Sequence, residues 1–111
     1  MKRYTLGICG GVSVENPTER DIREAVFALD SREGDAFLIL DQLEDGTFLQ
    51  ASGDRDVGFE LAHQDSSAQQ FRAKRDFSAG EIVRKFTSFS QGNPDWKNGM
   101  EWEFLGKAEM A

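Results

Sequence analysis

Hydrophobic and polar positions follow two different periods at the start of the chain, first that of a strand and then that of a helix. Residues 3–14 alternate loosely, which predicts an opening strand that the glycines between residues 7 and 11 bend or bulge. A helix start follows, because Asn16 is a favoured N-cap, Pro17 suits the first helical position and Glu19 can return a hydrogen bond to the cap. Behind it, apolar residues recur on one helical stripe: Ile22, Ala25, Val26 and Leu29.

The middle of the chain returns to a period of two and is divided by turn residues. We expect four strands here, over residues 36–42, 47–52, 57–63 and 69–75. The first is apolar on both faces, as in a central strand, and the Asp45-Gly46 pair after it is a hairpin signal. Short turns predict an antiparallel meander, in which a symmetric last turn would place Glu60 opposite Arg72.

A second helix and a closing strand complete the pattern. Ser78 and Glu81 have capping-box spacing, a stripe containing Phe86 and Phe89 follows, and Gly92-Asn93-Pro94 ends the helix. Residues 101–105 alternate as a last strand. The element order β-α-β-β-β-β-α-β predicts an α+β fold: one domain over residues 1–111, with a mostly antiparallel sheet of about six strands and two helices packed on one face.

The composition suits a folded chain in a reducing compartment. Hydrophobic residues make up 39% of the 111 residues and include nine Phe, enough for one core. Cys9 is the single cysteine, so no disulfide framework can form. The polar, glycine-broken N-terminal stretch does not fit a signal peptide, and the sequence has no apolar run of membrane-spanning length. We therefore expect a cytoplasmic protein without membrane contact.

The negative charge is concentrated in the predicted meander. The net charge is −7, and residues 36–70 hold only Arg55 against seven acidic residues, which accounts for six of those seven charges. Such a segment would attract a cationic protein and speed its association, although acidic residues also serve solubility alone. Direct nucleic-acid binding is disfavoured, because the basic residues do not form the stripe that phosphates require.

No motif in the sequence indicates a catalytic centre. His63 and Cys9 are the only residues of their types; we interpret His63 as ending a strand on the core side and Cys9 as a small buried hydrophobe. The glycines of residues 7–11 lack the lysine of a phosphate-binding loop, and the acidic turns do not match the spacing of a calcium loop. We therefore expect no cofactor, no metal ion and no enzymatic activity.

A family resemblance gives the binding hypothesis a direction. The order of elements, the Asn16-Pro17 helix start, the Phe-rich second helix, and the run from Phe89 to Pro94 followed by Trp102 resemble Imm1-type immunity proteins of bacterial polymorphic toxin systems. The resemblance spans residues 14–104. It implies a protein that binds a cognate toxin, such as a nuclease or a nucleic-acid deaminase, and blocks the active site of that toxin.

The leading hypothesis is therefore an immunity protein that neutralises a basic toxin through an acidic surface. The expected partner-binding residues are Asp41, Glu44, Asp45, Asp54, Asp56, Glu60 and, as an aromatic anchor, Trp96. Trp96 could instead form a lid over the second helix. Lysine at both Asp54 and Asp56 should leave folding nearly intact and slow association. The alternatives are a small subunit or adaptor of a larger complex, which predicts an apolar patch, and a small acid/base enzyme, which predicts a pocket. Oligomeric state is left open.

Overall fold

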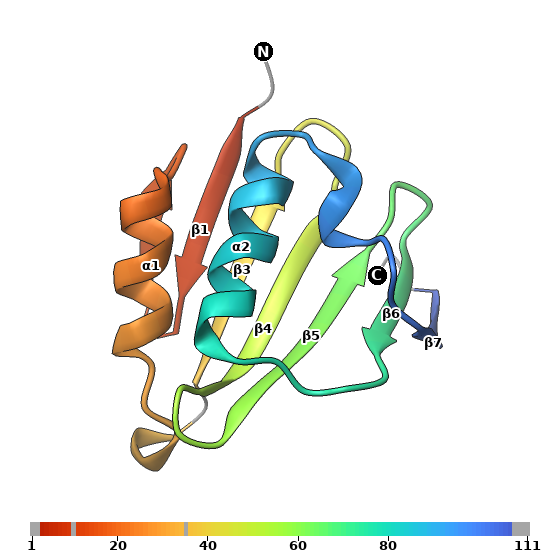
Figure 1. The fold of residues 1–111 in the computed structure, drawn as a ribbon. Coiled ribbons are helices and arrows are strands. Elements are labelled where there is room, and N and C mark those ends of the chain that lie inside the picture. Colours follow the sequence, from red (N-terminus) through yellow and green to blue (C-terminus); the bar gives the residue numbers. More distant parts are fainter. Residues whose placement is uncertain (1–2, 10, 35, 108–111) are drawn as a thin grey trace.

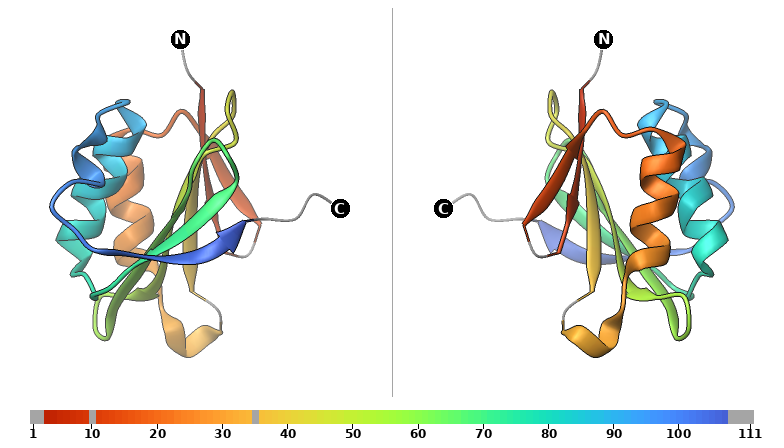
Figure 2. Two further views of the ribbon diagram at one scale, coloured as in Figure 1. Left: turned by 90° about the vertical axis from the view of Figure 1, so that its right-hand side faces the viewer. Right: turned by 90° about the vertical axis from the view of Figure 1, so that its left-hand side faces the viewer.

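A seven-stranded antiparallel sheet with two α-helices on one of its faces forms the structure (Figures 1 and 2), a computed structural model that describes residues 3–9, 11–34 and 36–107. The strands are β1 Tyr4–Ile8, β2 Val12–Glu15, β3 Phe37–Gln42, β4 Phe48–Asp54, β5 Gly58–Gln64, β6 Gln69–Ala73 and β7 Trp102–Lys107. The helices are α1 Glu19–Ala28 and α2 Ala79–Ser90, with short 3-10 helices η1 Ser31–Glu33 and η2 Pro94–Trp96. The predicted α+β fold with one antiparallel sheet is confirmed.

The strand count differs from the prediction of six, because the opening strand is a hairpin. The predicted strand over residues 3–14 is divided into β1 and β2, which pair antiparallel with Leu6 opposite Val14. Gly11 has a φ of 92°, and its N–H donates to the Ile8 carbonyl at 3.2 Å, which closes the turn; residue 10 lies outside the described residues. Gly11 can adopt this left-handed conformation because it has no Cβ, and the chain reverses direction here, whereas we expected a bend within one strand.

The first hairpin joins the sheet next to a strand that is distant in sequence. The strand order is β2-β1-β3-β4-β5-β6-β7, so β1 lies between β2 and β3. Leu6 faces Leu40 across the β1–β3 pair, and α1 lies between these two strands in the chain. The remaining strands follow in sequence order, which is the predicted meander.

The predicted N-cap of α1 is wrong by two residues. Thr18 is the cap, and its hydroxyl accepts from the Asp21 N–H at 3.1 Å while the Asp21 carboxylate accepts from the Thr18 N–H at 2.9 Å. Asn16 has a φ of 47° and exchanges hydrogen bonds with the backbone of Tyr4. Pairing with β1 therefore uses the side chain that would otherwise cap the helix. The capping box of Ser78 and Glu81 at α2 is confirmed.

The register of the last meander hairpin also differs from the expectation. Arg72 lies opposite Ala62 and not opposite Glu60. The turn is centred on residue 67 where we expected residue 66, and moving the centre by one residue changes the partner of each residue by two positions. Ala68 adopts a φ of 63° in this turn. Arg72 forms its ion pair with Glu103 of β7 instead, at 3.2 Å.

The core fills the space between the sheet and the two helices. α2 packs against α1 and lies over β3, β4 and β5 (Figure 1). Each helix contributes one apolar stripe, and the alternate residues of the central strands meet it. The largest fully buried side chains are Leu6, Ile22, Val26, Leu38, Leu40, Leu49, Phe59, Leu61, Ile82, Val83 and Phe86.

Two phenylalanines test which layer stabilises the fold. Phe86 of α2 is fully buried, whereas Phe104 of β7 is 57% exposed. Phe86→Ala should lower the free energy of unfolding by about 3–5 kcal/mol, because it removes a core ring and leaves a cavity. Phe104→Ala should lower it by less than about 1 kcal/mol. Urea denaturation measures both values, and similar losses would contradict this description of the core.

Candidate functional site

One face of the sheet carries no helix within the described ranges (Figure 2). Successive side chains of a strand point to opposite faces, so every second residue of β3, β4 and β5 points away from the helices. The register sets these side chains in rows, in which Ile39 lies beside Gln50 and Gln50 beside Ala62. We call this surface the open face; in the three central strands it consists of Phe37, Ile39, Asp41, Phe48, Gln50, Ser52, Glu60, Ala62 and Gln64.

The open face is apolar in part and hollowed at one end. Phe37, Ile39 and Phe48 are only partly buried, because the helices cover the other side of these strands. A depression of about 510 Å³ lies nearer the β4–β5 turn, bordered by Phe37, Gln50, Ser52 and Glu60 of the face and by Ser31 and Gly34 of the α1–β3 link. A partly apolar surface with a depression can receive a protruding group of another protein.

In the three central strands, the negative charge of the open face comes from Asp41 and Glu60; farther along the same face, Arg72 of β6 is paired with Glu103 of β7. Neither Asp41 nor Glu60 forms an ion pair with a lysine or arginine of the described residues. Burial raises the pKa of Asp41 above its ordinary value, because part of its hydration shell is lost. A cation placed beside Asp41 would offset this loss.

Asp54 is a structural residue in the β4–β5 turn. Its side chain is 4% exposed and accepts hydrogen bonds from the Ser31 N–H and hydroxyl and from the Asp56 and Val57 N–H groups. These bonds, led by the Ser31 hydroxyl, hold the pKa of Asp54 well below its usual range. The preceding Gly53 has a φ of 129°, and a Cβ there would lie 2.2 Å from the Gly58 carbonyl oxygen. Asp54 is therefore not the exposed residue that the sequence suggested, and we now expect lysine at this position to disrupt folding.

The other three predicted carboxylates lie in turns at opposite ends of the sheet. Asp56 is exposed in the β4–β5 turn. Glu44, in the β3–β4 turn, accepts from the Arg3 N–H at 3.0 Å and its Nε at 2.9 Å, and these bonds lower the pKa of Glu44. Asp45 accepts at Oδ1 from the N–H and hydroxyl of Thr47. Of the six predicted acidic residues, the structure places Asp41 and Glu60 on the open face.

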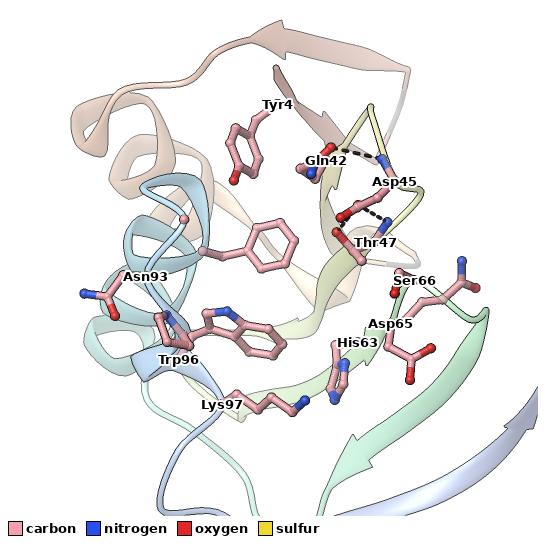
Figure 3. Close-up of a pocket in the computed structure, with 14 residues that line it drawn as sticks. Tyr4, Gln42, Asp45, Thr47, His63, Asp65, Ser66, Asn93, Trp96 and Lys97 are labelled. Carbon is pink, nitrogen blue, oxygen red and sulfur yellow. Dashed lines mark hydrogen bonds between the residues drawn. The ribbon is translucent and has the colours of Figure 1, made fainter. Parts of the chain in front are cut away.

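A second hollow, which we call the end cleft, lies where the β3–β4 and β5–β6 turns approach the C-terminal end of α2 (Figure 3). Its volume is about 280 Å³. Aromatic side chains make up much of its wall: Tyr4, His63, Phe89 and Trp96. Its charged lining residues are Asp45, Asp65 and Lys97. The end cleft thus brings together Asp45 and Trp96, two of the predicted residues that are distant in sequence.

Trp96 covers the end of α2 and also lines the end cleft. The 3-10 helix η2 begins where the Asn93 side chain accepts from the Asp95 N–H at 3.0 Å. The Trp96 ring then lies 5.4 Å from Phe89 and 5.0 Å from His63 between ring centroids, edge-on to both. It is partly buried: the ring packs on Phe89 of α2, as a lid would, and part of it lines the end cleft, while the role of Trp96 as an aromatic anchor stays a prediction.

His63 is buried among rings and stays neutral. It is 3% exposed, stacks on Phe71 at 5.0 Å and meets the edges of Trp96 and Trp102. Burial, with a smaller contribution from Lys97, lowers the pKa of His63 to about 4. Within the described residues, no hydrogen bond to either ring nitrogen is found, and neither nitrogen is completely enclosed. The core-side position predicted for His63 is confirmed, and a neutral imidazole lines the end cleft.

Sequence reasoning missed most of the end cleft, since its wall comes from the first strand, two turns and the segment after α2. Tyr4, Asp65, Phe89 and Lys97 carry no local motif that would unite them. Cys9 is partly buried against the core, less enclosed than expected. Within the described ranges, no three His, Cys, Asp or Glu side chains are grouped to hold a metal ion, and no helix has the length and apolar character to cross a membrane.

Comparison of the chain with protein-family models, with curated proteins and with solved structures gives no match. The function proposed below accordingly rests on the chain's own residues.

The two aspartates of the β4–β5 turn should respond differently to the same substitution. Asp54→Lys should unfold the protein or lower its Tm strongly, because it leaves four donors without their acceptor and buries a charge. Asp56→Lys should change Tm little, because Asp56 is exposed. Thermal unfolding followed by circular dichroism measures both; a native Tm for Asp54→Lys would contradict the structural role.

His63 predicts a specific pH dependence of stability. Its folded pKa of about 4 lies below the ordinary value of 6.5, so between these values the unfolded chain binds a proton that the folded chain does not. Stability should therefore fall as the pH drops from about 6.5 to about 4. His63→Phe, which keeps a stacking ring, should lose this component while retaining the titration of the carboxylates. Urea midpoints of both proteins across this range test it, and parallel curves would disprove the assignment.

Proposed function

We infer that this protein binds and neutralises a basic protein, as an immunity protein does, and that the partner docks on the open face. The observation that carries this proposal is a sheet surface on which no helix of the described residues lies. There, partly exposed Phe37, Ile39 and Phe48 accompany Asp41 and Glu60, two carboxylates that form no ion pair within the same residues. An apolar centre supplies contact area, while charges set orientation and exclude wrong partners.

Charge complementarity supports a basic partner. The chain carries a net charge of −7, so a cationic protein is attracted before contact and its association is accelerated. Asp41 has already lost part of its hydration in the free protein. The binding of a cation there therefore costs less further desolvation of the carboxylate. Enzymes that act on nucleic acids present basic surfaces to phosphates, which makes a nuclease or a nucleic-acid deaminase a fitting target.

Inhibition would follow from occlusion. A protein seated on the open face would bring its cationic surface against two carboxylates, and the same surface could not then reach a phosphate backbone. This mechanism needs no reaction by the immunity protein itself. It agrees with what the resemblance to Imm1-type immunity proteins implies, and it gives the rigid sheet the role of a preformed docking surface.

A second candidate, a small subunit or adaptor of a larger complex, is favoured by one observation. Phe104 and Leu105 of β7 are 57% and 48% exposed at the edge of the sheet. Permanent assembly would use such apolar side chains together with those of the open face. The two candidates differ in their response to salt, since a complex held by apolar contacts resists salt that weakens a charge-steered one.

Charge reversal on the open face should slow association with the partner. The partner is obtained by capture from lysate of the source cells at low salt, and its binding is then followed by surface plasmon resonance. Glu60→Lys should reduce the association rate constant by about tenfold at low salt, because it replaces attraction by repulsion. Gln50→Arg, in the centre of the face, should block docking by its size and charge.

The matched control is Glu24→Lys, the same charge change on an exposed residue of α1, in the layer opposite the open face. It should slow association far less than Glu60→Lys. Equal effects of the two changes would show that net charge alone matters and would reject the open face as the docking site. The captured protein should also lose its enzymatic activity when one equivalent of the wild-type chain is added, and full activity in the complex would reject the immunity function.

A further inference from the structure

The end cleft has the features of a binding site separate from the open face. It lies beside the C-terminal end of α2, and its wall is built from four segments that are distant in sequence. The rings of Tyr4, Phe89 and Trp96 hold one another in place, with Tyr4 5.7 Å and Trp96 5.4 Å from Phe89 between centroids. The Trp102 indole N–H donates to the Lys97 carbonyl at 3.2 Å and so fixes the segment that carries the lid.

His63 indicates that the end cleft takes a ligand. The residue is only 3% exposed and no hydrogen bond to its ring nitrogens is found among the residues that the structure describes, but the nitrogens are not completely enclosed, so water or a ligand can reach them. The ring lines the end cleft (Figure 3), and at neutral pH it offers one N–H donor and one nitrogen acceptor. A ligand with a hydrogen-bonding group would satisfy it.

Three features make the end cleft favourable for a cation. Asp45 and Asp65 each use Oδ1 to hold a turn, Asp45 for Thr47 and Asp65 for Ser67 and Gln69, and within the described residues each Oδ2 remains unused. The helix α2 directs the negative end of its dipole at the end cleft. Burial raises the pKa of Tyr4, and the nearby charges of Asp45 and Glu44 act in the same direction.

We propose that the end cleft binds the guanidinium group of an arginine side chain. A guanidinium is flat, stacks on aromatic faces and presents several N–H donors, which matches aromatic walls, two free carboxylate oxygens and a neutral imidazole acceptor. Among the described lining residues, Lys97 is the one cation, against two aspartates; its side chain points toward His63 (Figure 3), so a bound guanidinium would take the place of the Lys97 ammonium. This inference does not depend on the partner proposed for the open face.

The test is a titration of the whole chain with N-acetyl-arginine amide, followed by Trp fluorescence and by NMR of the His63 and Trp96 rings. N-acetyl-citrulline amide, the neutral counterpart of equal shape, is the first comparison, and it should bind about tenfold more weakly or not at all. Free arginine distinguishes the source of the group, because a site for a polypeptide side chain accepts the capped form at least as well. N-acetyl-aspartate amide tests the opposite charge.

Asp45→Asn combined with Asp65→Asn supplies the matched variant. Asparagine can still accept the turn hydrogen bonds at Oδ1, so folding should be retained while the negative charge is removed. The variant should lose the preference for arginine over citrulline, and Asp56→Asn at the other end of the sheet should keep it. Equal binding of citrulline, preferential binding of the aspartate compound, or no binding of any compound at millimolar concentration would each overturn the proposal.

Discussion

Burial of one sheet face against α1 and α2 is the interaction on which the rest of this molecule depends. The strands of the meander bring Leu40, Leu49 and Leu61 into one apolar layer, and Phe86 of α2 completes it. The helices lie on one side of the seven-stranded sheet, where α2 packs over the central strands β3, β4 and β5. The opposite side is thereby left to solvent or to another protein, and the asymmetry that stabilises the fold also creates the surface on which we base its function.

The carboxylates serve two purposes: some accept hydrogen bonds in turns, and others are free to attract a partner. The net charge of the chain does not distinguish the two groups. Asp54 accepts four hydrogen bonds. Asp45 and Asp65 accept hydrogen bonds within their own turns, and Glu44 accepts two from Arg3, just before β1. These groups stabilise the backbone between strands, where exposed N–H groups need acceptors. Fewer carboxylates therefore remain for a docking surface, and these lie on strands and not in turns. The charge of a segment therefore overstates the charge that it offers to a partner.

The sequence predicted the elements well and their junctions less well, for physical reasons. Apolar residues that recur every second position, or along one side of a helix, indicate which face of an element is buried. The strands of the meander and both helices could therefore be predicted. The N-cap moved from Asn16 to Thr18 because Asn16 binds the backbone of Tyr4, a contact with a strand far back in the chain. The prediction that both helices pack on one face of the sheet is confirmed, and the open face is the other side of that sheet. The end cleft was not predicted, since four short segments meet there and none of them carries a motif.

The position of β1 has a consequence for the order in which the molecule folds. Each hairpin of the meander joins neighbours in the chain, so its loops close early and at little cost in entropy. The β1–β3 pair cannot form until α1 and η1 have brought the first hairpin back to the sheet. We expect β3 to β6, which short turns connect, to make up the nucleus, and α2 with β7 and the N-terminal hairpin to join later. A ribosome releases the N-terminal hairpin first, so that segment must wait, exposed, for most of the chain to be synthesised.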